Sequence, residues 1–272
     1  MTERDVVEST HGLPATVDSI AKDLHNLGVQ PGMVLLVHSS LSSLGWVSGG
    51  APAVILGLEK AIDPEGTLVM PTFTGDLSEP SNWRNPSVPE WWWQLIRDTM
   101  PPFDPDLTPT RMMGLIPETF RKQKGTIRSI HPDLSFAARG PCAERITSNQ
   151  QLDYGLGENS PLARIYELDG RVLFIGVGHK NNTSMHLAEY RASRPGKREL
   201  KLGSPMMVDG KREWIEYTNI EYREDLLQKI GEDFERETDV VIKGKVAQAD
   251  AKLFPQRALV DYTVSWIEKH LK

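Results

Sequence analysis

The chain of 272 residues is 39% hydrophobic, which is enough for a full core and excludes a globally disordered protein. Its 31 Lys and Arg against 37 Asp and Glu give a net charge of −6, which argues against a nucleic-acid partner and would attract a cationic small molecule. No stretch approaches the ~20 apolar residues that span a bilayer, and the polar N-terminus lacks the apolar region of a signal peptide. The single cysteine, Cys142, and the absence of paired Cys/His spacing favour a cytoplasmic protein without a zinc site.

The first part of the chain alternates helices with apolar strands. Apolar residues at helical spacing predict a helix over 17–27, and Gly28 stands where a left-handed C-cap belongs. The apolar runs at 33–37 and 67–73 predict two buried strands, and the composition of 53–62 predicts a helix between them. This order is typical of the α/β class.

Residues 74–109 interrupt this alternation. They are rich in Pro, Asn, Ser and Trp and have little periodicity beyond a possible short helix at 91–97. Loops of this length in compact domains are usually functional or disordered, and the aromatic content favours an ordered, lid-like insertion over one face of the sheet. A tryptophan cluster that only fills a satellite core is the alternative.

The remaining elements complete one domain. The pair Asp209-Gly210 predicts a hairpin turn between strands at 205–208 and 213–217. Further elements are expected at 172–177 (a strand), from Thr183 onward (a helix), and at 222–234 and 256–271 (helices). Because no repeat or linker divides the chain, we expect residues 1–272 to form a single α/β domain, a mixed β-sheet flanked by helices.

A serine-rich loop follows the first predicted strand. Its polar groups and glycines are His38, Ser39, Ser40, Ser42, Ser43 and Gly45, with Leu41 among them, and Gly49 and Gly50 just before the next helix. Such a loop can bind a phosphate, because backbone N–H groups and the helix dipole both attract an anion. It matches neither a P-loop nor a dinucleotide-binding fingerprint, so an ordinary strand-to-helix turn stays open.

A histidine and a glutamate follow the third predicted strand. Asn182 or Thr183 is a natural N-cap, which places His186 at the start of a helix and Glu189 one turn later on the same face. The positive helix end favours a neutral His186 that can act as a base, and Glu189 can fix its tautomer. A helix-surface ion pair is the alternative. No third ligand suggests a metal, and no Gly-x-Ser-x-Gly suggests a serine hydrolase.

Together these stretches resemble the aminoglycoside 3-N-acetyltransferase family of antibiotic acetyltransferases. The likeness extends from about Pro31 to Arg191 and is weaker toward the C-terminus. The matching pieces, in chain order, are 38–45 with 49–50, 70–74, 102–105, 128–132 with Ser135, 159–162, and 183–186 with Glu189. The resemblance implies acetyl transfer from acetyl-CoA to an amine, on a fold distinct from that of the GNAT acetyltransferases. It also implies that the serine-rich loop and Gly49-Gly50 hold CoA, and that His186 and Glu189 form the catalytic pair.

The chemistry of acetyl transfer agrees with a donor site at the serine-rich loop and a catalytic pair at His186 and Glu189. An amine at neutral pH must lose a proton as it attacks the thioester, and a neutral His186 suits that task, with Glu189 orienting the ring. Backbone N–H groups at 39–41 or the Thr72 hydroxyl are candidate oxyanion donors, and we assign Thr72 and Ser135 to the donor site. Direct transfer in a ternary complex is expected, because no activated nucleophile is evident.

The acceptor is the least determined part. Asp76 follows the second predicted strand, where ligands gather in α/β sheets, and with Glu79 and Glu90 it would form an acidic wall for a polycationic aminoglycoside. A solvated acidic surface is the alternative. An acetyltransferase for a different amine and a non-catalytic CoA-binding protein stay open as functions, and the oligomeric state is undetermined.

Overall fold

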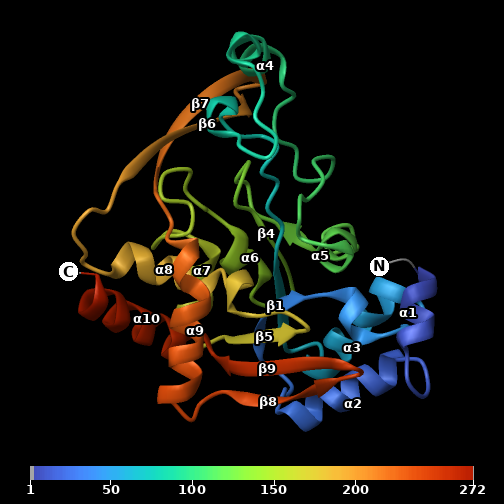
Figure 1. Cartoon of the computed structure of the whole chain (residues 1–272). Coiled ribbons are helices and arrows are strands. Elements are labelled where there is room, and N and C mark those ends of the chain that lie inside the picture. Colours follow the sequence, from blue (N-terminus) through green and yellow to red (C-terminus); the bar gives the residue numbers. More distant parts are fainter. Residues whose placement is uncertain (1–2, 272) are drawn as a thin grey trace.

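The computed structural model describes residues 3–271, and in this part of the chain a seven-stranded mixed sheet forms the middle of three layers (Figure 1). The strand order is β3-β4-β2-β1-β5-β9-β8, and β6 pairs only with β7. The strands are β1 (Val34–Ser39), β2 (Thr67–Pro71), β3 (Ile127–Arg128), β4 (Phe136–Arg139), β5 (Arg171–Ile175), β6 (Glu199–Val208), β7 (Lys211–Ile220), β8 (Ile242–Val246) and β9 (Ala249–Pro255). The expected α/β fold with a mixed sheet is confirmed.

Three parallel strands, β2, β1 and β5, form the centre of the sheet. Antiparallel strands continue it on both sides, β4 beside β2 and β9 beside β5. The central strands are apolar and buried on both faces, as parallel strands covered by helices require. Because they run in one direction, Ser39, Pro71 and Ile175 end at the same edge of the sheet, where ligands bind in open α/β sheets.

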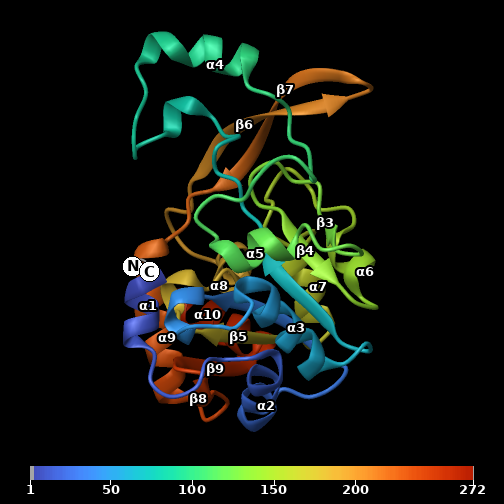
Figure 2. The ribbon, with the colours of Figure 1, turned by 90° about the vertical axis from the view of Figure 1, so that its right-hand side faces the viewer.

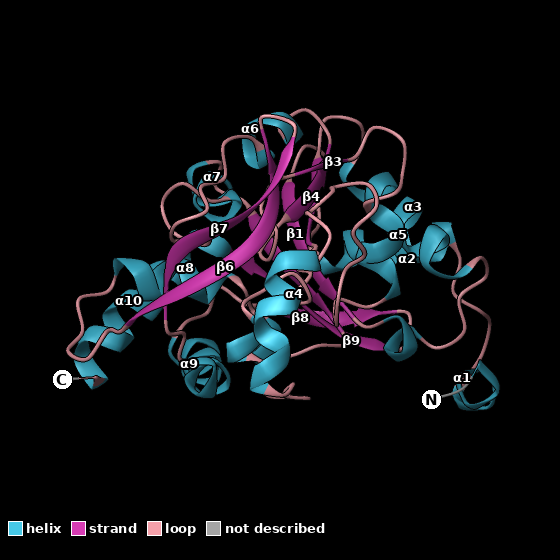
Figure 3. Ribbon diagram, turned by 90° about the horizontal axis from the view of Figure 1, so that it is seen from above, coloured by secondary structure: helices cyan, strands magenta, loops and turns pink. Residues whose placement is uncertain are grey.

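Helices cover both faces of this sheet (Figures 2 and 3). The helices are α1 (Glu3–Ser9), α2 (Val17–Leu27), α3 (Gly50–Ile62), α4 (Trp93–Thr99), α5 (Leu115–Phe120), α6 (Ala143–Thr147), α7 (Pro161–Glu167), α8 (Ser184–Arg191), α9 (Glu224–Glu237) and α10 (Gln256–His270). Short 3-10 turns are η1 (Leu41–Leu44), η2 (Pro80–Asn82), η3 (Glu90–Trp92) and η4 (His179–Asn181). Helices α2, α3 and α5 pack on one face, and α6 to α10 pack on the other.

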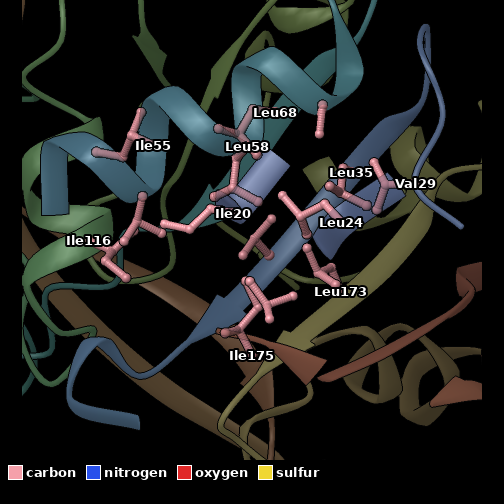
Figure 4. Close-up of a cluster of buried hydrophobic side chains, with 14 of the residues drawn as sticks. Ile20, Leu24, Val29, Leu35, Ile55, Leu58, Leu68, Ile116, Leu173 and Ile175 are labelled. Carbon is pink, nitrogen blue, oxygen red and sulfur yellow. The ribbon is translucent and has the colours of Figure 1, made fainter. Parts of the chain in front are cut away.

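Alternation along each strand divides the core into two clusters. On β1, Leu35 faces the cluster of α2 and α3, and Leu36 faces the opposite cluster. The same alternation holds on β5 for Leu173 and Phe174. Figure 4 shows the first cluster, in which Ile20 of α2 and Leu58 of α3 meet the strand side chains. Burying each such side chain contributes about 1.5–3 kcal/mol to the fold.

Local signals explain why the first two predicted helices form where they do. Thr16 and Ser19 form a capping box at the start of α2, and Gly28 ends it with φ +104°. Helix α3 begins at Gly50, three residues before the predicted start. Pro52 is compatible with this earlier start, because the first turn of a helix requires no N–H at that position.

The sequence patterns missed several short elements. Strands β3 and β4 are only two and four residues long, which is too short to show a strand periodicity, although β4 is mostly apolar. The prediction also missed β8, β9 and the helices α1, α5, α6 and α7. The predicted hairpin forms at Asp209-Gly210, but its strands are ten residues each.

The insertion does not lie over a sheet face. Residues 77–103 and the β6–β7 hairpin together form an arm that projects away from the seven-stranded sheet (Figures 1 and 2). Phe103 N–H donates to Pro205 O at 3.0 Å, and Arg212 Nε donates to Met100 O at 2.8 Å. Trp91 is 79% exposed, so it fills no satellite core. The arm therefore consists of two segments that are distant in sequence.

No helix within residues 3–271 is both long enough and apolar enough to cross a lipid bilayer.

Candidate active site

A buried histidine and glutamate form a hydrogen-bonded pair at the start of α8. The helix begins beyond the carboxyl end of β5, and Asn182 Oδ1 accepts the Ser184 N–H at 3.3 Å. His186 Nδ1 lies 2.7 Å from Glu189 Oε2, and the two residues are 7% and 2% exposed. A carboxylate can only accept here, so Nδ1 carries a proton, and in the neutral ring Nε2 then keeps its lone pair. The pair therefore has the protonation pattern of a general base with its orienting carboxylate.

A second segment of the chain holds this pair from the other side. Arg223 N–H donates to Glu189 Oε1 at 2.6 Å, so both carboxylate oxygens are bound. The ring of Tyr222 lies against the ring of His186, with centroids 4.3 Å apart and planes 40° apart. These two residues connect β7 to α9. The sequence pattern predicted a helix over 222–234 that includes both residues, and nothing in it pointed to a place for them in the site.

A hollow of about 710 Å³ opens beside the serine-rich loop. Its walls come from the loop after β1, the start of α3, the segment before α5 and the loop after β5, and include Ser39, Ser40, Leu41, Ser42, Gly45, Gly50, Met112, Met113, Val177 and Asn181. Ser39 Oγ is buried and has no hydrogen-bond partner among the described residues. An unpaired buried hydroxyl is costly unless a ligand or water satisfies it. The Ser39 hydroxyl is therefore one donor beside the hollow that no described residue uses.

A second hollow of about 510 Å³ adjoins the first, since Met112 and Met113 line both. Its lining includes the acidic residues Asp133 and Glu224, the aromatic residues Phe73 and Trp83, and two arginines, Arg84 and Arg111. Glu224 directly follows Tyr222 and Arg223, so the chain that holds the histidine–glutamate pair continues into this hollow. Burial raises the pKa of Asp133 to about 6.

Comparison with known proteins agrees with this arrangement. The model of the family "Aminoglycoside 3-N-acetyltransferase" matches residues 36–268. The chain belongs to the aminoglycoside 3-N-acetyltransferase family. It is 45% identical to the SPbeta prophage-derived aminoglycoside N(3')-acetyltransferase-like protein YokD of Bacillus subtilis, over 97% of this chain and 96% of that protein. It is 33% identical to aminoglycoside N(3)-acetyltransferase VII of Streptomyces paromomycinus, over 100% of this chain and 97% of that one.

Solved structures of the same acetyltransferase family have the same fold. The crystal structure of YokD superposes with a TM-score of 0.95 at 44% identity, covering 98% of each chain. The structure described as AAC-IIIb binary with CoASH has a TM-score of 0.85 at 30% identity, covering 95% of this chain and 98% of that chain. The family resemblance stated from the sequence motifs is confirmed, and with it the assignment of this chain to an acyltransferase family.

The other predicted residues of the acetyltransferase donor site lie in different places. Ser43 Oγ donates to Gly176 O at 3.4 Å and joins the loops after β1 and β5. His38 is buried against Phe174, with its Nε2 3.4 Å from Thr183 Oγ1. Burial and the neighbouring His186 lower the pKa of His38 to about 3, so it stays neutral and cannot attract a phosphate by charge. Gly49 is the N-cap of α3, with φ +91°.

Thr72 and Ser135 come together, but outside the lining of the first hollow. Their hydroxyl oxygens are 3.1 Å apart, and Ser135 Oγ accepts Arg128 Nε at 3.0 Å. The buried Arg128 also donates to the backbone oxygens of Thr72, Pro105 and Thr108. Burial lowers the pKa of this guanidinium to about 10, which leaves it protonated at neutral pH. The network thus ties the end of β2 to the chain that returns from the arm.

Two carboxylates of the predicted acidic wall bind arginines. Asp76 forms an ion pair with Arg111, and Glu79 binds Arg97 through Nη2 at 2.6 Å. Burial opposes ionisation of Glu79, but hydrogen bonds from Arg97 and Ser81 outweigh it and lower its pKa. Glu79 therefore holds α4 within the arm. Neither Asp76 nor Glu79 belongs to the lining of the second hollow.

The part of the chain that the structure describes contains no group of three or more His, Cys, Asp or Glu side chains arranged to hold a metal ion.

Proposed function

We propose that this protein transfers the acetyl group of acetyl-CoA to the 3-amino group of an aminoglycoside. The observation that carries the proposal is the buried His186–Glu189 pair, held by a segment that continues into one of two adjoining hollows. Family membership supports the reaction class. The solved relative with CoASH supports CoA as the donor.

In this proposal His186 is the general base. Its Nε2 accepts the proton of the acceptor amine as the amine nitrogen attacks the carbonyl carbon, and can return that proton to the departing sulfur. Glu189 keeps Nδ1 protonated and stabilises the imidazolium that forms. Proton transfer of this kind contributes about 10²–10⁴-fold to the rate. Transfer is direct, since no activated nucleophile lies in the hollows.

We assign the donor to the first hollow. Donors for phosphate and carbonyl oxygens come from the hydroxyls of Ser40 and Ser42, which lie 3.2 Å from each other, and from the start of α3 at Gly50. The neighbouring Ser39 hydroxyl is buried and has no hydrogen-bond partner among the described residues. Gly49 and Gly50 have φ of +91° and +59°, which turn the chain sharply into the helix. The buried positions of Thr72 and Ser135 give their predicted part in donor binding no such support.

We assign the acceptor to the second hollow. Its carboxyl groups, Asp133 and Glu224, are suited to hydrogen bonds with ammonium groups, and Trp83 and Phe73 offer faces for a sugar ring. This assignment replaces Asp76 and Glu79, whose carboxylates already bind Arg111 and Arg97. We also propose a cytoplasmic location, consistent with the single free Cys142.

An acceptor panel tests the proposal. The purified protein is mixed with acetyl-CoA and either aminoglycosides or simpler amines, and thiol release is followed while the product is mapped by NMR. We expect turnover with aminoglycosides and an acetyl group on the 3-amino nitrogen. Turnover with other amines alone would support an acetyltransferase of different specificity. Binding of CoA without any turnover would identify a non-catalytic CoA-binding protein.

A further inference from the structure

The contact between Tyr222 and His186 carries an inference beyond the proposed base. The two rings are 4.3 Å apart between centroids, which is close for an aromatic pair, and they come from different elements. The face of a phenol ring is negative and attracts a cation. Tyr222 therefore lies where it can stabilise a positive charge on His186.

Tyr222 is itself fixed by hydrogen bonds. Its hydroxyl oxygen lies 2.7 Å from that of Tyr190, and Tyr190 in turn donates to Asn219 Oδ1. Asn219 Oδ1 also accepts the Ile220 N–H at 2.8 Å, which holds it at the end of β7. Because Tyr190 lies on α8 beside Glu189, the hydroxyl chain connects the helix of the pair to the hairpin.

Adjacent residues thus restrain both members of the pair. The Tyr222 ring covers the His186 ring, and the Arg223 N–H holds the Glu189 carboxylate. The Arg223 side chain points elsewhere, since it forms an ion pair with Asp225. The restraint on Glu189 therefore comes from the backbone, whereas the restraint on His186 depends on the side chain at position 222.

We propose that Tyr222 is a positioning residue for the acetyl transfer, whose ring fixes the orientation of His186 and stabilises its imidazolium when the amine proton has been accepted. This inference rests on the proposed function, because it takes His186 as the base.

The charged and titratable groups around the pair are compatible with this role. Glu189 on the same helix is the only anion bound to His186 within the described residues. His38, at the end of β1, is neutral and adds no repulsion in its usual state. The positive charges of Lys197 and Arg223 attract the carboxylate of Glu189. The phenols of Tyr190 and Tyr222 stay protonated, because burial raises the pKa of each. Imidazolium at His186 therefore has two stabilising neighbours, Glu189 and Tyr222.

The test compares Tyr222→Leu, which removes the ring, with Tyr222→Phe, which removes only the hydroxyl. In Tyr222→Leu we expect kcat to fall at least tenfold and the acidic limb of the pH profile to move to lower pH by at least half a pH unit. In Tyr222→Phe we expect a loss of a few-fold with the limb in place. Tyr262→Leu is the control, since Tyr262 packs on Phe234 away from the pair, and its profile should match the wild type.

NMR titration of the His186 ring gives a readout that needs no turnover. In Tyr222→Leu we expect the titration of the His186 ring to move to lower pH by the same amount as the acidic limb. Failure of the proposed function would appear as no turnover by the wild type, whereas failure of this inference would appear as an unmoved titration. If Tyr222→Leu does not fold, Tyr222→Met replaces it. A wild-type titration of His186 in the non-aromatic variant, or a loss of kcat with an unmoved limb, would overturn the inference.

Discussion

The Nδ1 atom of His186 lies 2.7 Å from Oε2 of Glu189, three residues further along α8. The other carboxylate oxygen is bound by the Arg223 N–H at 2.6 Å, so Glu189 cannot turn away without breaking a buried hydrogen bond. This relationship fixes the ring tautomer before any substrate binds. It also separates two tasks that mutation can test, proton acceptance by His186 and orientation by Glu189.

Replacement of His186 by alanine should slow acetylation strongly and leave donor binding intact. We expect kcat to fall by about 10²–10⁴-fold, because no other described group replaces the base. The rise in Tm caused by acetyl-CoA should match the wild type, since the first hollow does not include His186. Steady-state kinetics and thermal shifts measure the two effects. His11→Ala, at an exposed histidine, is the control, and equal turnover in both variants would remove His186 from the mechanism.

The Glu189→Gln variant should lower kcat more than it raises KM. Glutamine can still accept the Arg223 N–H, but it offers no negative charge to the imidazolium, so we expect a loss of about 10–100-fold in kcat. Glu158→Gln, which removes the carboxylate of an exposed ion pair with Arg191, is the matched control. A lower Tm with normal kcat would make Glu189 only a structural partner of the helix.

Valine at Gly50 should weaken donor binding. Gly50 has φ +59° at the start of α3, and a side chain there would project into space where the donor is assigned. Gly210, at the hairpin turn, has φ +77° and is equally open, so Gly210→Val carries a comparable backbone cost without touching the first hollow. We expect acetyl-CoA to raise the Tm of Gly210→Val as in the wild type and that of Gly50→Val by clearly less. Equal shifts would move the phosphate site elsewhere.

Asp133 should make stability fall as pH rises through about 6. Burial raises its pKa to about 6, above the ~3.9 of an exposed aspartate, so the native state binds more protons than the unfolded state between these values. The stabilising effect is complete below pH ~4 and is lost above pH ~6. Asp133→Asn does not titrate, so its free energy of unfolding relative to the wild type should increase by about 1–3 kcal/mol from pH 4 to 7.5.

Urea unfolding of both proteins across this pH range measures that difference. Asp18→Asn, at an exposed carboxylate paired with Lys60, is the control. A difference between Asp133→Asn and the wild type that stays constant with pH would contradict the expected titration of Asp133.

The central architecture was predictable because its signals are local. The apolar runs of β1, β2 and β5 and the capping residues around α2 depend on neighbours in sequence, and His186 and Glu189 share one helix turn. Strand β4 has only four residues, too few for a clear pattern, and they are held as a strand by pairing with β2, which sequence periodicity does not encode.

The same limit explains which contacts of the candidate site the sequence could not show. Tyr222 and Arg223 reach the pair only because β7 returns the chain to α8, a contact across more than 30 residues. Asp76 and Glu79 were predicted to bind the acceptor from their position and charge, but Arg111 and Arg97 reach them through the folding of the arm. A carboxylate count cannot tell a free acidic group from one already paired.

The two halves of the arm differ in how freely they can change during evolution. Residues 77–103 leave and rejoin the body through loops, so insertions there can reshape the arm with little loop-closure cost. Strand β7 runs directly into Tyr222 and Arg223, and adding one residue would displace both by ~3.3 Å. Diversification of the arm by length change is therefore expected in residues 77–103, whereas the hairpin can vary its outer side chains but must keep its register.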